Sequence, residues 1–120
     1  MLVEIIQPDF QFDDDRGSLV QLIRDGYKQV NVITSTKNVE RGNHYHKENI
    51  EAFYIISGKF ELKLKKDNIE ETYVFSEGDM FRIQPYVIHS FYYLEDTTLV
   101  SMYSKGVEKD DGTKDIYTEK

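Results

Sequence analysis

Residues 41–58 read RGNHYHKENIEAFYIISG, and this stretch decides the fold. It contains a His-x-His pair, His44 and His46, followed five residues later by a carboxylate at Glu51. On a β-strand, side chains two residues apart point to the same face, so the two imidazoles would project together. Polar side chains that point into a small barrel need a partner there, because an unpaired buried charge is costly.

The segment GDMFRIQPYVIHSF, residues 78–91, adds the third and last histidine of the chain, His89. Any one histidine alone would be interpreted as a solvated or hydrogen-bonded side chain. Three imidazoles and a carboxylate together form a ligand set for a divalent metal, with coordination positions left over. Zn, Fe, Mn, Co and Ni all suit this set, and the residues do not choose among them. The predicted metal ligands are His44, His46, Glu51 and His89.

Composition indicates a single domain and excludes several kinds of partner. A chain of 120 residues falls in the usual size range of one domain. Its formal net charge of −7 disfavours nonspecific nucleic-acid binding, which requires a basic surface. The chain has no cysteine, so disulfides and thiolate metal sites are excluded. No apolar run is long enough to cross a membrane. We expect a soluble cytoplasmic protein with neither nucleic acid nor membrane as partner.

Hydrophobic alternation indicates many short strands. In KFELKLK, residues 59–65, Phe60 and Leu62 share one face while charged side chains occupy the other. Asp67-Asn68 is a suitable hairpin turn after this strand. No window shows sustained helical periodicity. Arg41-Gly42 is interpreted as a turn. The other predicted strands are 2–7, 18–24, 29–34, 52–57, 71–75, 80–84, 89–94 and 98–104.

Short strands at close spacing predict an all-β protein, a closed sandwich or barrel in one domain. We assign the barrel to residues 1–104. Residues 105–120 are polar and highly charged, and we predict a surface tail there, or an arm over a partner subunit. Barrels of this kind leave strand edges that a second copy can cover, which favours a homodimer.

The two histidine segments resemble the motifs of the cupin superfamily. Its first motif carries His-x-His, Glu and Gly, and its second carries Gly, Pro and His, matched here by Gly78, Pro85 and His89. The chain departs from the pattern at Asn38 and at Val87, where the family usually has glycine. The resemblance covers roughly residues 30 to 104. It implies a double-stranded β-helix, the cupin jelly-roll barrel.

A further resemblance is to the RmlC-like branch that acts on nucleotide sugars. The acidic-Arg-Gly segment at residues 15–17 and Arg-Gly-x-His at residues 41–44 are similar to segments of dTDP-4-dehydrorhamnose 3,5-epimerases and dTDP-sugar 3,4-ketoisomerases. The cupin domain of bifunctional capsular-polysaccharide epimerase/reductases belongs to the same branch. The resemblance implies that His44 is a general base and Tyr103 a general acid. It implies that Arg41 and Arg16 hold a diphosphate, for which a guanidinium is well suited.

The complete ligand set separates the chain from parts of this branch. The 3,5-epimerases carry glutamine where this chain has His46, and they need no metal. The ketoisomerases generally carry glutamine at the position of Glu51. The retained set is most similar to the metal-binding cupin domain of the bifunctional capsular enzymes. His44 cannot be a metal ligand and a free base at the same time, and the sequence leaves both roles open.

Simpler interpretations compete for the other residues. Residues 13–16 can be a solvated turn with a weak ion pair, Arg41 can merely flank a turn, and Tyr103 can be a packing residue. Our first hypothesis is an epimerase or keto-isomerase of a dTDP- or UDP-linked 4-keto sugar, in surface-polysaccharide or deoxysugar synthesis. It removes the proton beside the ketone, with a divalent metal as cofactor. The alternatives are a metal-dependent oxygenase or isomerase of another small molecule, and a non-catalytic sugar-binding cupin.

Overall fold

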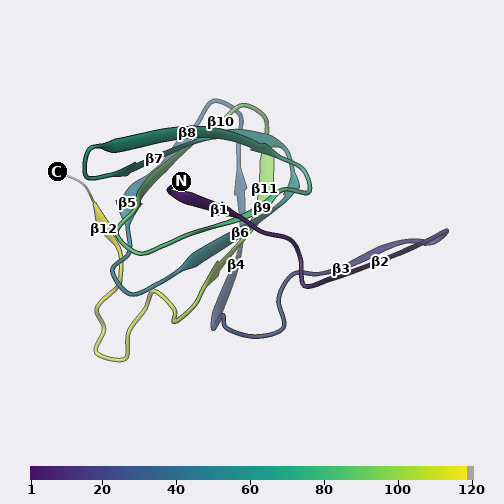
Figure 1. Ribbon diagram of the computed structural model, residues 1–120, viewed down its shortest axis with the longest axis horizontal. Helices are drawn as coiled ribbons and strands as arrows, with labels where there is room; N and C mark the ends of the chain where they lie inside the picture. The colour runs from purple at the N-terminus through teal and green to yellow at the C-terminus, as the bar shows by residue number, and fades with distance from the viewer. Residues whose placement is uncertain (119–120) are drawn as a thin grey trace.

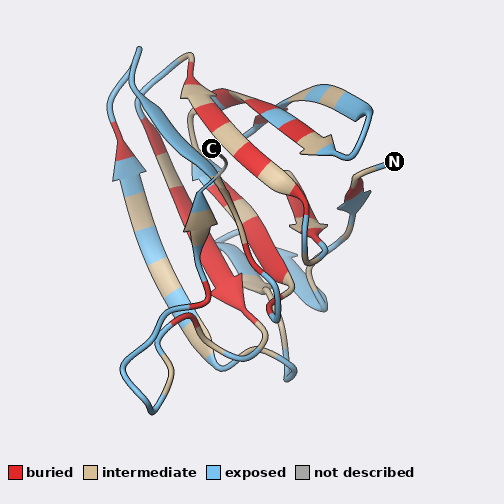
Figure 2. Cartoon of the chain, turned by 90° about the vertical axis from the view of Figure 1, so that its left-hand side faces the viewer, coloured by how far each residue is buried: buried red, intermediate tan, exposed pale blue. Residues whose placement is uncertain are grey.

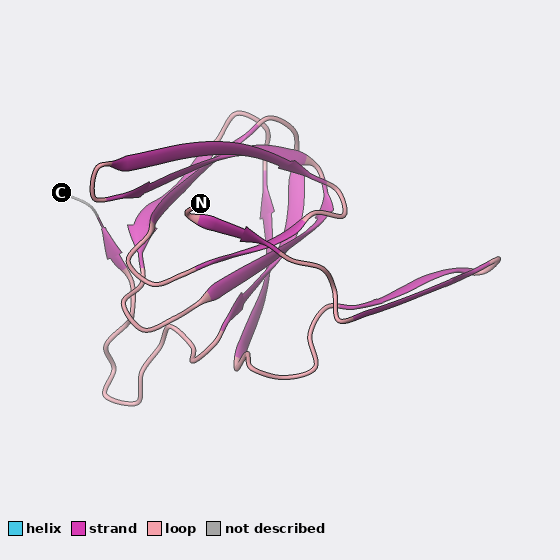
Figure 3. Ribbon diagram, viewed as in Figure 1, coloured by secondary structure: helices cyan, strands magenta, loops and turns pink. Residues whose placement is uncertain are grey.

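The computed structural model describes residues 1–118, and every regular element in that range is a β-strand (Figures 1 and 3). None of these residues forms a helix of the length and apolarity that crossing a membrane requires. The last two residues of the predicted tail, 119–120, lie outside the described residues. The predicted all-β fold class is confirmed.

Two five-stranded antiparallel sheets face one another and form the barrel. The antiparallel order with non-consecutive neighbours is the double-stranded β-helix expected for a cupin. The first sheet runs β1 (Val3–Ile5), β9 (Met80–Ile83), β6 (Glu51–Ser57), β11 (Thr97–Tyr103) and β4 (Gln29–Ser35). The second sheet runs β12 (Tyr117–Thr118), β5 (Glu40–Tyr45), β10 (Ile88–Tyr93), β7 (Lys59–Lys66) and β8 (Ile69–Ser76).

Aromatic and aliphatic side chains from both sheets fill the barrel. Buried and exposed positions alternate along the strands (Figure 2), and on β7 the predicted inward residues, Phe60 and Leu62, are fully buried. The ring of Phe81 stacks on Phe53 at 4.9 Å and on Phe75 at 4.3 Å between centroids. Each such side chain contributes about 1.5–3 kcal/mol by leaving water. This packed layer supports one end of the polar cluster described below.

The predicted turn at Arg41-Gly42 is wrong, because both residues lie inside β5. The strand instead contains a bulge, at which its register with β10 shifts. Gly42 and Asn43 both have left-handed backbones, with φ of 103° and 62°. A Cβ atom at Gly42 would lie 2.7 Å from the carbonyl oxygen of His89. Glycine is therefore required where β5 crosses close to β10, and the bulge redirects the end of β5.

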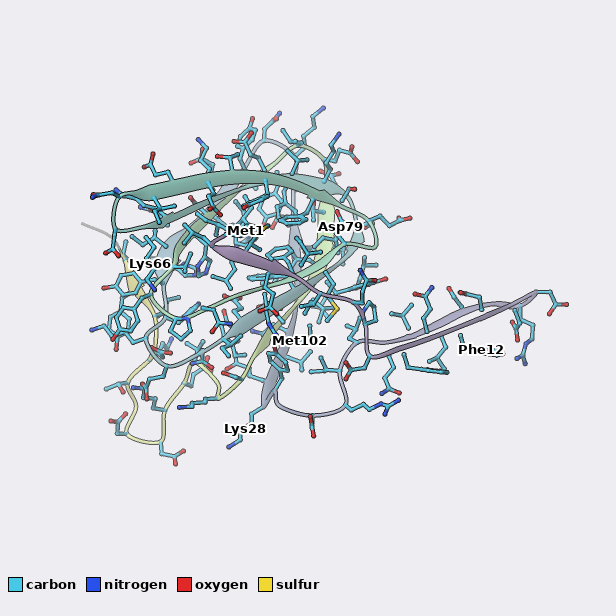
Figure 4. The ribbon with its side chains drawn as sticks, in the orientation of Figure 1. Met1, Phe12, Lys28, Lys66, Asp79 and Met102 are labelled. Atoms are coloured by element: carbon cyan, nitrogen blue, oxygen red, sulfur yellow. The ribbon has the colours of Figure 1, made fainter. Side chains whose placement is uncertain are left out.

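A two-stranded hairpin projects away from the barrel (Figure 1). It consists of β2 (Phe10–Asp14), for which no strand was predicted, and β3 (Gly17–Gln21), which overlaps the predicted strand 18–24 and begins one residue earlier. Phe12 lies far out on this hairpin (Figure 4) and is 49% exposed. Phe10 and Leu19 are exposed as well. The hairpin therefore presents apolar side chains that its own chain does not cover.

Residues 105–118 follow the barrel surface and return to it. Val107 and Asp115 are buried, and Tyr117 of β12 pairs with Tyr45 of β5. The segment that was predicted as a polar tail is mostly exposed but contributes an edge strand and a buried carboxylate. The boundary drawn at residue 104 stays a prediction.

Candidate histidine–carboxylate centre

The four predicted metal ligands come together inside the barrel. His44 ends β5 together with Tyr45, His46 follows the strand, Glu51 opens β6, and His89 lies on β10. Each offers one ligand atom, and these atoms all lie within 4.8 Å of one another. His46, Glu51 and His89 are buried, and His44 is partly exposed. Residues up to 45 positions apart thus form one compact centre.

Glu51 holds the middle of this centre. One carboxylate oxygen, Oε1, lies 3.0 Å from Nε2 of His46 and 3.3 Å from Nε2 of His89. The other, Oε2, accepts a hydrogen bond of 2.6 Å from the hydroxyl of Ser101 on β11. Burial alone would raise the pKa of Glu51, but the contacts with His46 and His89 lower it well below its usual range. Glu51 is therefore ionised at neutral pH.

Backbone carbonyls orient two of the imidazoles. Nδ1 of His46 donates to the carbonyl of Asp115 over 2.6 Å, and Nδ1 of His89 donates to the carbonyl of Val87 over 2.9 Å. Carbonyls only accept hydrogen bonds, so both Nδ1 atoms carry protons. In the neutral rings, the Nε2 lone pairs of His46 and His89 then face the anionic Oε1 of Glu51.

Such a group of acceptors needs a cation at its centre. A proton on His46 is one solution. Burial alone would lower the pKa of His46, but the contact with Glu51 raises it above the ordinary value. Nε2 of His89 has no hydrogen-bond partner within residues 1–118. A divalent metal satisfies all of these atoms together, and imidazole and carboxylate are suitable ligands for it.

His44 and Tyr103, the predicted catalytic pair, line the same cavity of about 290 Å³. Burial, together with repulsion from His89, lowers the pKa of His44 to about 4, so the ring is neutral at pH 7. Tyr103 packs edge-on against the ring of His46, 5.2 Å away. Burial and the nearby charge of Glu51 raise the pKa of Tyr103, so its phenol keeps its proton. The cavity therefore presents a proton acceptor and a proton donor.

The two predicted phosphate-binding arginines lie in different parts of the structure, one at the cavity and one on the projecting hairpin. Arg41 lines the cavity and also a second pocket, lined by Thr34 and Ser35 as well. Its Nε donates to Ser35 over 2.7 Å, and its Nη2 donates to the carbonyl of Thr34 over 3.2 Å. Arg16 lies at the tip of the projecting hairpin, paired with Asp14, and its side chain is 83% exposed. Within one chain, the structure does not bring Arg16 to the cavity.

Two residues that support the centre, Ser101 and Asp115, were not identified from the sequence. Ser101 is fully buried on β11 between Val100 and Met102, and a serine within this apolar stretch would have been a usable signal. Asp115 gave no signal, since it is one acidic residue in a charged segment. Its carboxylate accepts from the backbone N–H of Lys47 and Glu48 and from the side chain of Asn49, at 2.7–3.0 Å. These bonds fix the carbonyl that orients His46.

Together, the fold and this centre define a cupin-type barrel with a buried histidine–carboxylate cluster. The chain belongs to the family described as the polysaccharide biosynthesis C-terminal domain, whose model matches residues 12–112. No curated protein sequence matches the chain. Solved structures with the same barrel are RmlC-like enzymes, which confirms the predicted resemblance.

Three solved structures illustrate the similarity. A double mutant of the 3,4-ketoisomerase QdtA from Thermoanaerobacterium thermosaccharolyticum, in complex with TDP, is 25% identical, with a TM-score of 0.73 over 86% of this chain and 80% of that one. The capsular polysaccharide assembling protein CapF from Staphylococcus aureus is 25% identical, with a TM-score of 0.68 over 91% of this chain but only 32% of CapF. The dTDP-4-dehydrorhamnose 3,5-epimerase from Sulfolobus tokodaii is 22% identical, with a TM-score of 0.73 over 86% of this chain and 70% of that one, and shows the fold alone.

The substitution Asp115→Ala tests the support of His46. It leaves enclosed donors without an acceptor, each costing about 1–3 kcal/mol, so the free energy of unfolding should fall by at least about 2 kcal/mol. Urea denaturation followed by circular dichroism measures this change. The matched control is Asp111→Ala, an exposed aspartate of the same segment that bonds only to Thr113. Equal losses of unfolding free energy in the two variants would contradict the role of Asp115 as the support of His46.

Proposed function

We propose that this protein is an epimerase or keto-isomerase of a nucleotide-linked 4-keto sugar. The observation that carries the proposal is the single cavity that contains His44, Tyr103 and Arg41. The similarity to a ketoisomerase in complex with TDP supports the same substrate class. The cavity volume of about 290 Å³ suits one sugar ring, with the nucleotide extending out past Arg41.

The side chains supply the proton transfers of this reaction. In the metal-free centre, neutral His44 accepts the proton from the carbon beside the ketone, and the phenol of Tyr103 donates a proton to the other face. The low pKa of His44 keeps the ring free to accept a proton but makes it a weak base. Arg41 binds the diphosphate, for which its guanidinium exchanges the bonds to Ser35 and Thr34.

We also propose that the centre holds one divalent metal, bound by His44, His46, Glu51 and His89. The support is the convergence of two Nε2 lone pairs on Glu51 and the unpartnered Nε2 of His89. A bound divalent ion would supply Lewis-acid polarisation of the keto oxygen. His44 is then occupied as a ligand, so proton removal falls to another group in the cavity.

Elemental analysis of protein purified without chelators tests the metal proposal. We expect about one divalent metal per chain, since four suitable ligands converge. The double substitution His46→Ala with Glu51→Ala should abolish metal retention and leave a folded barrel, because the aromatic core is separate. The control is Glu70→Ala, which changes an exposed residue of β8 and should retain metal. Metal-free wild-type protein would overturn the proposal and leave His44 free as the base.

Arg41 is tested by titration calorimetry with dTDP and UDP. Charge-assisted bonds are worth about 1.5–3 kcal/mol, so Arg41→Ala should weaken binding by about tenfold to a hundredfold. Arg41→Lys should restore only part of the affinity, because an ammonium cannot replace the planar fork. Binding by Arg41→Ala that equals wild type, or no binding of either nucleotide by wild type, would overturn the nucleotide-sugar assignment.

We further propose a homodimer in which the β2–β3 hairpin lies against a second copy. The support is the exposed apolar surface of Phe10, Phe12 and Leu19 on an element that projects from its own barrel. A role for Arg16 in phosphate binding also requires this arrangement, because Arg16 does not reach the cavity of its own chain. The hairpin would then carry Arg16 toward the partner's cavity.

Sedimentation equilibrium tests the homodimer. Wild type should have twice the chain mass of 14.2 kDa, and Phe12→Asp should shift it toward one chain, because a buried charge opposes apolar contact. Ile69→Asp on β8 is the matched control, since Ile69 is exposed to a similar degree, 54% against 49% for Phe12. A wild-type monomer, or equal behaviour of the two variants, would contradict the hairpin interface.

One observation favours a second candidate, a metal-dependent oxygenase or isomerase of a smaller molecule. The metal-ligand set is complete, whereas Arg16 lies outside the cavity and Arg41 is bonded to its own chain. A small ligand would fill the cavity without needing either arginine.

Deuterium incorporation separates the two candidates. Incubation of a dTDP-linked 4-keto sugar with the protein in deuterated water should place deuterium at C3 or C5, as read by mass spectrometry and NMR. Tyr103→Phe should slow completed turnover more than exchange at the carbon, because the phenol returns the proton. Exchange at neither carbon would rule out the epimerase or isomerase reaction and leave the second candidate or a binding protein.

A further inference from the structure

A cleft separate from the histidine–carboxylate centre is larger than the cavity of that centre. It has a volume of about 1040 Å³ and opens on the outer side of the second sheet, where β5 and β12 meet the turn between β7 and β8. Lys66, labelled in Figure 4, lies at this turn beside the C-terminal strand. The cleft is lined by Tyr45, Lys66, Asp67, Tyr86, Ile88, Ile116, Tyr117 and Thr118.

Three tyrosine rings form a row along this cleft. The ring of Tyr45 stacks on that of Tyr117, with centroids 5.5 Å apart and planes inclined by 28°. The ring of Tyr45 also stacks on that of Tyr86, with centroids 6.2 Å apart and planes inclined by 27°. Tyr86 is 53% exposed, so this row is not a closed aromatic core. The ammonium of Lys47 lies 4.2 Å from the centroid of Tyr117 and holds that ring by a cation–π contact.

Backbone strain holds Tyr86 in this row. Its φ of 69° lies in the left-handed region, which residues other than glycine seldom adopt. The backbone N–H of Tyr86 donates to the carbonyl of His46 over 2.7 Å and fixes the position. The turn at residues 85–86 thus holds the ring of Tyr86 against Tyr45 and leaves about half of the residue exposed at the cleft.

The polar lining indicates the class of ligand. Lys66 and Asp67 are the charged residues among the lining side chains, one cation and one anion, and Thr118 adds a hydroxyl. This balance of donors and acceptors provides no excess charge for a phosphate or a nucleic acid. The exposed ring of Tyr86, with polar side chains in the same cleft, matches a ring that is apolar on its faces and carries hydroxyl groups at its edge.

We propose that the Tyr45–Tyr86–Tyr117 cleft binds a neutral oligosaccharide. One sugar ring lies on the exposed ring of Tyr86, and Lys66, Asp67 and Thr118 bond to hydroxyl groups of the sugar. The site is separate from the cavity of the histidine–carboxylate centre, because Tyr45 points to the opposite side of β5 from His44. Its volume accommodates several linked sugar rings rather than one.

Titration with maltotriose, cellotriose and triacetylchitotriose, followed by ¹H–¹⁵N NMR, tests this site. At least one of the three should shift the resonances of Tyr45, Tyr86 and Tyr117 with a millimolar dissociation constant. Tyr86→Ala should weaken binding by about tenfold or more, as for loss of one good aromatic contact, and Tyr86→Phe should retain most of it. The control is Tyr92→Ala, which changes a tyrosine of β10 outside the cleft and should bind as wild type.

Three results would overturn the proposal. The first is no shift with any of the three sugars at about 10 mM. The second is equal affinity in Tyr86→Ala and wild type. The third is a set of shifts that depends on protein concentration without sugar, which would make the cleft a contact between copies of the chain. Calorimetry with dTDP on Tyr86→Ala keeps the two sites apart, since that affinity should not change whether or not the nucleotide-sugar assignment holds.

Discussion

Glu51 places an ionised carboxylate inside a barrel filled mainly by phenylalanine, leucine and isoleucine. An uncompensated charge at such a position would cost several kcal/mol. Each carboxylate oxygen has polar neighbours. The Ser101 hydroxyl donates to Oε2, and the Nε2 atoms of two imidazoles lie beside Oε1. Both imidazoles are turned so that Nε2 faces the carboxylate. A proton on His46 or a bound cation would compensate the charge of Glu51, so this arrangement creates a position for a cation.

The orientation of those imidazoles depends on backbone that lies outside the cluster. The carbonyls of Val87 and Asp115 set the direction of the rings, and the bulge at Gly42 lets β5 approach β10 closely enough to include His44. Antiparallel pairing brings the ends of β5, β6, β10 and β11 to one level of the barrel. The chemistry proposed for the cavity therefore rests on strand register as much as on the identity of the ligands.

Residue patterns predicted an all-β sandwich or barrel, and the resemblance to cupins specified the jelly roll. The four predicted ligands do converge, and their binding of a metal stays a prediction. Alternation in residues 59–65 predicts the inward face of β7, and the His-x-His spacing predicts paired imidazoles. The bulge at Gly42 was interpreted as a turn, because glycine after arginine has the same local signal in both structures. Asp115 was not predictable, since its role depends on where a charged segment returns in space. Arg16 was grouped with Arg41 by motif, and only the three-dimensional structure separates them.

The bond between His46 and the carbonyl of Asp115 joins residues 69 positions apart in the chain. During synthesis the paired strands β4 to β11 leave the ribosome before residue 115 does, so they can begin to assemble while His46 still lacks its acceptor. Closing so long a loop is also slow compared with forming a hairpin such as β7–β8. The centre therefore cannot reach its final form before residue 115 is in place. Until then, the ring of His46 lacks the acceptor that turns its Nε2 toward Glu51.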